Sequence, residues 1–102
     1  MMDTKSLVLA AKARFNHNSA KAYLKEKYDA KLLVADQGGL WKADQQTISS
    51  LTSFHDEEVV LIDTFDNPVR VNRQNLLDKL TTTYNEVMND WYNEWKELES
   101  KR

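Results

Sequence analysis

Hydrophobic residues in the last third of the chain follow a helical repeat. Two columns recur every seven positions: Leu77, Tyr84, Trp91 and Leu98 form one, and Thr81, Met88 and Trp95 form the other. Four further residues widen this stripe: Leu76, Leu80, Val87 and Tyr92. The spacing is typical of the d and a positions of a coiled-coil seam. It predicts a long amphipathic helix over residues 73–100, with Asn72 as its N-cap.

The middle of the chain carries the pattern of β-hairpins. Val59 to Ile62 is the longest apolar run and predicts a central strand covered on both faces. The turn residues 66–68 follow, and then Val69 and Val71 alternate with Arg70, as on a half-buried partner strand. Asp63 and Asp66 flank this turn, and we expect their side chains to form hydrogen bonds within it instead of binding a cation.

An earlier hairpin is predicted around Gly38-Gly39. Both glycines can supply the positive φ angles of a tight turn between residues 32–34 and residues 40–41. Asp44 is a plausible cap for a short helix, in which Ile48, Leu51 and Phe54 stand at helical spacing.

The first 30 residues are rich in Ala, Leu and Lys, which favour helix. Asn16-His17-Asn18 interrupts them with weak helix formers. The pattern fits two helices, about 5–15 and 19–28, with a surface junction at His17, or one bent helix.

These elements predict a single α+β domain over residues 1–102. It comprises a basic helical segment (1–30), two hairpins with a short helix between them (31–72) and a long C-terminal helix (73–102). The two hairpins are expected to form a small antiparallel sheet.

Composition narrows the class of protein. Of its 102 residues 41% are hydrophobic, which is too high for a disordered chain. The chain has no cysteine, and this excludes a disulfide framework and a thiolate zinc site. No apolar run approaches the roughly 20 residues of a membrane helix, so no membrane partner is expected, and the N-terminus lacks the layout of a signal peptide. Charge is uneven: residues 1–31 carry a net +4 and residues 32–102 a net −6. Two such halves can attract each other within one copy or between copies.

No constellation of side chains points to catalysis. His55 stands beside three carboxylates, but neighbouring residues on a loop point apart, so a solvated charged turn is expected instead of a metal site. Gly38-Gly39 lacks the Lys-Ser/Thr of a phosphate loop, and the serines of 49–53 lack a nucleophile elbow. We therefore expect no catalytic residue, no metal, no cofactor and no enzyme activity.

The aromatic end of the last helix is the first candidate site. A 28-residue helix is about 42 Å long, whereas a 100-residue domain has a radius of gyration of about 13 Å. Part of the helix should overhang the body unless the N-terminal helices run alongside it. Trp and Tyr dominate interface energies. The candidate partner-binding residues are Met88, Trp91, Tyr92, Trp95 and Leu98. They are either core or a surface for a protein partner, including a second copy; in the second case, changing Trp91 and Trp95 to Ala would abolish binding and spare the fold.

The basic first half offers a second candidate contact. Its residues are Lys12, Arg14, Lys21 and Lys25, which can approach phosphates while Phe15 and Tyr23 stack on bases. The protein as a whole is acidic, with a pI near 5.6, and this disfavours nucleic acid as a partner.

The stretches "VVLIDTFDNPVRVNRQNLLDKL" and "YNEVMNDWYNEWKEL", with "ARFNHNSAKAYLKEKY" and "QGGLWKAD", resemble small proteins of contractile-tailed bacteriophages, including those of marine cyanobacteria. The resemblance implies a virion component or assembly factor that acts through protein contacts, in the virion or the host cytoplasm, where its partner is itself or another phage protein. The alternative is a phage regulatory protein that binds host machinery or nucleic acid through the basic N-terminal helices.

Overall fold

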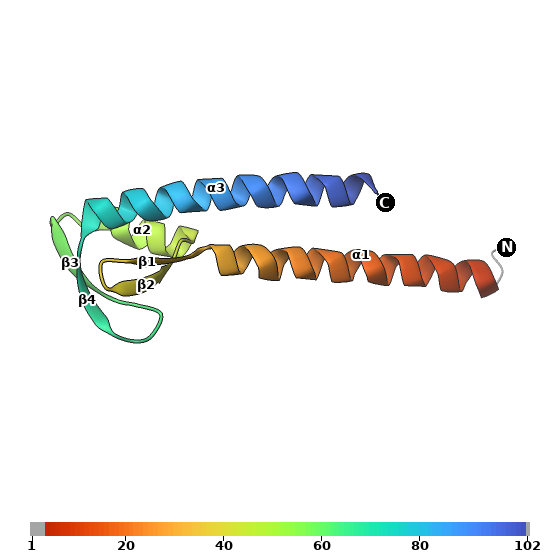
Figure 1. The fold of residues 1–102 in the computed structure, drawn as a ribbon, viewed down its shortest axis with the longest axis horizontal. Coiled ribbons are helices and arrows are strands. Elements are labelled where there is room, and N and C mark those ends of the chain that lie inside the picture. The colour runs from red at the N-terminus through yellow and green to blue at the C-terminus, as the bar shows by residue number, and fades with distance from the viewer. Residues whose placement is uncertain (1–3, 102) are drawn as a thin grey trace.

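Two long helices and a small β-rich head make up the molecule. The computed structural model describes residues 4–101, with side chains from residue 17 onward. The elements in chain order are α1 (Thr4–Lys31), β1 (Leu33–Asp36), β2 (Gly39–Lys42), α2 (Gln45–Ser53), β3 (Glu58–Ile62), β4 (Pro68–Asn72) and α3 (Arg73–Ser100). Helices α1 and α3 lie antiparallel, and residues 32–72, here called the head, join them at one end (Figure 1). The α+β class predicted from sequence is confirmed.

The molecule is elongated. Its principal extents are 66 × 24 × 20 Å and its radius of gyration is 19.6 Å, against about 13 Å for a compact domain of this size. The reason is that each long helix has 28 residues, and the pair extends away from the head. The overhanging helix, however, is α1 and not α3. Its N-terminal end continues past the C-terminal end of α3 (Figure 1).

Helix α1 runs without a break through Asn16-His17-Asn18, so the interpretation as two helices with a surface junction is wrong. Weak helix propensity costs only a few tenths of a kcal/mol per residue, and tertiary contacts readily override it. His17 makes such a contact, because its Nε2 lies 3.1 Å from Glu99 Oε1 on α3.

Both predicted caps are present. The Asp44 carboxylate accepts a hydrogen bond from the Thr47 N–H (2.8 Å) at the start of α2, and the Asn72 side chain accepts one from the Asn75 N–H (2.9 Å) at the start of α3. Each satisfies an amide that the first helical turn leaves without an intrahelical partner. Helix α2 ends at Ser53, so Phe54 lies just outside it, while Leu51 is fully buried.

The first hairpin is present, but the two glycines have different roles. The turn residues are Gln37 and Gly38, with φ of 50° and 81°, and Gly39 already pairs with Asp36. A Cβ at position 39 would stand 2.5 Å from the indole of Trp41. Gly38 therefore serves the turn, whereas Gly39 leaves room for a buried tryptophan.

The second hairpin departs from the predicted central strand. β3 pairs only with β4, so the two hairpins form two separate two-stranded sheets. One face of the β3–β4 sheet packs on the core through Val71, while Val60 and Ile62 on the other face are exposed. The expectation of a strand covered on both sides is wrong, because no layer of the described chain lies over that face.

Side-chain hydrogen bonds connect the two sheets. The buried Asp63 carboxylate accepts hydrogen bonds from the backbone N–H groups of Leu40 (3.2 Å), Phe65 (2.9 Å) and Asn67 (3.0 Å). These bonds, with that from Asn67 the strongest influence, hold the pKa of Asp63 below its usual value. The predicted role of Asp63 in turn hydrogen bonding is thus observed. Its bond to Leu40 also fixes one hairpin on the other.

Candidate functional site

Helices α1 and α3 meet along a seam that differs from the predicted one. The column containing Tyr84, Trp91 and Leu98 packs against the core, as expected. The second column is formed by Leu80, Val87 and Glu94 instead of Thr81, Met88 and Trp95. Leu80 and Val87 are buried, and Glu94 contacts α1. Because one residue is about 100° of helical rotation, this shift leaves Met88 and Trp95 at the edge of the seam.

A network of polar and aromatic contacts joins the helices midway along the seam. Lys27 Nζ lies 2.6 Å from Glu94 Oε1, and the Tyr28 hydroxyl donates a hydrogen bond to the same oxygen. The Tyr28 ring stacks on Trp91, with centroids 5.9 Å apart and planes within 8°. Lys31 adds a cation over the Tyr28 ring, 4.9 Å from its centroid. Trp91 therefore holds the two helices together.

The electrostatics of this network follow from its hydrogen bonds. The bond from Lys27, and then that from Tyr28, favours the charged carboxylate and lowers the pKa of Glu94. The same carboxylate raises the pKa of Lys27 and of Tyr28, because each of them is held in its protonated form. All three shifts stabilise the arrangement at neutral pH.

Glu94→Gln tests this network through its pH dependence. The folded-state pKa of Glu94 lies below its usual value of 4.5, so its contribution to stability is present above that pH and is lost as the pH falls through the lowered pKa. We expect Glu94→Gln to melt below the wild type at pH 7, and the difference in Tm to shrink below about pH 4.5. Glu86→Gln, on the exposed side of α3, is the control. A difference that does not vary with pH would contradict the assignment.

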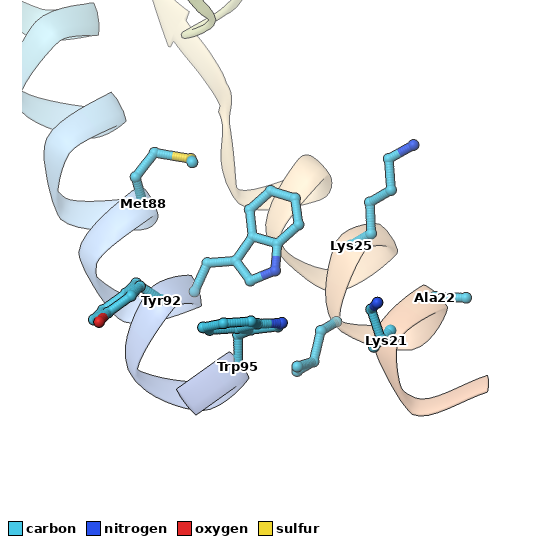
Figure 2. Close-up of a pocket in the computed structure, with 8 residues that line it drawn as sticks. Lys21, Ala22, Lys25, Met88, Tyr92 and Trp95 are labelled. Carbon is cyan, nitrogen blue, oxygen red and sulfur yellow. The ribbon is translucent and has the colours of Figure 1, made fainter. Parts of the chain in front are cut away.

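A largely apolar groove opens beside this seam, with a volume of about 520 Å³. Its lining residues, which define the groove below, are Lys21, Ala22, Leu24 and Lys25 of α1 and Met88, Trp91, Tyr92 and Trp95 of α3. Figure 2 shows Trp95 reaching from α3 toward Lys21 of α1. Tyr92 and Trp95 are 56% and 39% exposed and lie against each other, with centroids 6.0 Å apart. Exposed aromatics beside an apolar groove are typical of a protein-binding surface.

The structure brings most of the predicted partner-binding residues together. Met88, Trp91, Tyr92 and Trp95 all line the groove, whereas Leu98 packs against the core beyond it. Of the predicted basic contacts, Lys21 and Lys25 form the rim of this same groove. Lys12 and Arg14 belong to α1, but their side chains lie outside those that the structure describes. Sequence reasoning missed Ala22 and Leu24, which complete the α1 side of the groove.

Other chemistry suggested by the sequence has no counterpart in the described part of the chain. Residues 55–58 are exposed in the loop before β3 and at its start, and no group of three or more His, Asp or Glu side chains within the described residues converges as a metal site would. None of the helices described has the length and hydropathy needed to cross a lipid bilayer.

No protein-family model matches this chain, and comparison with curated proteins and with solved structures returned no significant match.

Proposed function

We propose that this chain is a non-enzymatic bacteriophage accessory protein, a virion component or assembly factor that binds a protein partner through the groove. The observation that carries the proposal is the groove itself, where two exposed aromatics and a methionine border an apolar opening between two helices. An apolar opening between two antiparallel helices can take a third helix, which would complete a three-helix packing. The phage context rests on the sequence resemblance, and places the protein in the virion or the host cytoplasm.

The residues of the groove have separable roles in this proposal. Trp95 and Tyr92 are exposed and available as anchors for the partner, and Met88 adapts its shape to the incoming side chains. Trp91 forms the inner wall, but it also stacks on Tyr28 and so supports the fold. An alanine at position 91 would therefore disturb the helix pair, and the double change Trp91→Ala with Trp95→Ala does not isolate binding from folding.

Changing Tyr92 and Trp95 together to Ala is the cleaner test. Both side chains are already exposed, so the free energy of unfolding should fall by no more than about 1 kcal/mol. Association with phage particles or their assembly intermediates should be lost, as measured by co-sedimentation from lysates of the phage that encodes the protein. Tyr23→Ala is the matched control, because Tyr23 is an equally exposed aromatic on α1 outside the groove. Unchanged co-sedimentation of the double variant would refute the proposed function.

A further inference from the structure

The first part of helix α1 has no other part of the described chain beside it. The contact between His17 and Glu99 lies close to the end of α3 at Ser100. Residues 4–16 of α1, called the overhang below, continue past that end (Figure 1). At 1.5 Å per residue the overhang is about 20 Å long.

The composition of the overhang does not suit a solitary helix. Seven of its thirteen residues are apolar: Leu7, Val8, Leu9, Ala10, Ala11, Ala13 and Phe15. Of the six polar residues, Lys5, Lys12 and Asn16 fall within about 40° of one another, so the overhang has one polar side and a broad, mostly apolar remainder. The overhang therefore needs a surface to cover it.

The groove and the overhang belong to one continuous face of α1. Position 11 is eleven residues from Ala22, close to three turns, and position 7 is eighteen residues from Lys25, which is five turns. Ala22 and Lys25 line the groove. One face of α1 therefore borders the groove at residues 21–25 and belongs to the overhang at residues 4–16. The centres of these two segments are about 20 Å apart along the helix.

We propose that the occupant of the groove is the overhang of a second copy of this chain, in an antiparallel dimer with two-fold symmetry. This inference rests on the proposed function, since it names the partner of the same groove. The overhang is centred on position 10 and the α1 side of the groove on position 23. Placing one centre on the other sets position n of one α1 beside position 33 − n of its partner. The symmetry axis then passes near positions 16 and 17, and both grooves are filled at once.

The register pairs small residues at two places. Position 11 of each copy lies level with Ala22 of the other, and both positions are alanine. Small side chains allow close approach of the helix backbones. The exposed aromatics Tyr92 and Trp95 then flank the arriving helix, which removes from water the apolar surface of both partners.

The overhang and the C-terminal part of α3 carry opposite net charges. The overhang carries Lys5, Lys12 and Arg14 and no carboxylate, a net +3. Residues 86–99 of α3 hold five carboxylates and one lysine, a net −4. These opposite net charges favour the approach of the two segments at long range, while the α1 side of the groove itself carries Lys21 and Lys25.

Engineered cysteines test this register directly, because the natural chain has none. The full-length variants are Ala11→Cys, Ala22→Cys and the two combined. A disulfide needs Cα atoms about 4.4–6.8 Å apart, whereas positions 11 and 22 of one helix are about 16 Å apart. We expect the combined variant to form a covalent dimer under mild oxidation and each single variant to remain uncrosslinked. Light scattering at two concentrations should show a dimer for the unmodified chain.

Three outcomes would overturn the dimer: a strict monomer at both concentrations, a covalent dimer from a single variant (which would mean another register), and a dimer whose combined variant does not crosslink. Each is separable from failure of the proposed function. If the double change at Tyr92 and Trp95 still abolishes association with phage particles while the chain stays monomeric, the groove binds another protein and only the self-association is wrong.

Discussion

Replacing Trp41 by alanine is expected to lower the free energy of unfolding by about 3–5 kcal/mol, the usual cost of removing a large buried aromatic. Trp41 is 3% exposed, and its indole N–H donates a hydrogen bond to the Asp36 carbonyl (2.9 Å). It stands opposite Val34 in the first hairpin and packs against the space left by Gly39. Its loss would leave a cavity at the centre of the head.

Urea denaturation followed by far-UV circular dichroism measures this effect. Ile62→Ala is the matched control, because Ile62 is also a large apolar residue of the head but is 63% exposed; its loss should cost less than about 1 kcal/mol. A midpoint for Trp41→Ala that equals that of the control would show that the head is not organised around Trp41. The head joins α1 to α3, so loss of its packing should also weaken binding in the groove.

Leu80→Ala is expected to cost about 2–5 kcal/mol, because Leu80 is fully buried where α3 begins to pack on the rest of the chain. Helix α3 contacts α1, α2, β1 and β4. Leu80 also belongs to the column that the structure assigns to the seam, one position before the predicted Thr81. A matched change at that predicted position, Thr81→Ala, tests which column carries the packing.

The two variants should separate clearly in the same denaturation experiment. Thr81 is only partly buried, and removing its side chain should change the free energy of unfolding by less than about 1 kcal/mol. Equal costs at positions 80 and 81 would contradict the observed rotation of α3. They would also call into question the groove, since the same rotation places Trp95 and Met88 at its border.

The predictable part of this fold was local. Asn72 and Asp44 cap helices because the side-chain oxygen accepts a hydrogen bond from the free amide three residues later. This interaction is local and does not depend on tertiary contacts. The alternation of Val69, Arg70 and Val71 specified which face of β4 is buried. The repeat from Leu77 to Leu98 predicted a long helix with one apolar side, and it also pointed to the aromatic end as the place to look for a partner.

The tertiary structure decided how the elements are rotated and offset against one another, which local sequence patterns leave open. The apolar stripe of α3 is wide enough for two rotations, and the contacts of Glu94 with Lys27 and Tyr28 select one of them. Helix α1 continues through His17, which contacts Glu99 of α3. Whether an aromatic is core or surface followed from that rotation: Trp91 turned toward Tyr28, and Trp95 toward the opening. The sequence by itself determined the type and approximate bounds of most elements, since these depend on neighbours along the chain, but it left open the continuity of α1. Which apolar residues stay uncovered depends on how two 28-residue helices are offset against each other, and only packing between distant segments sets that offset.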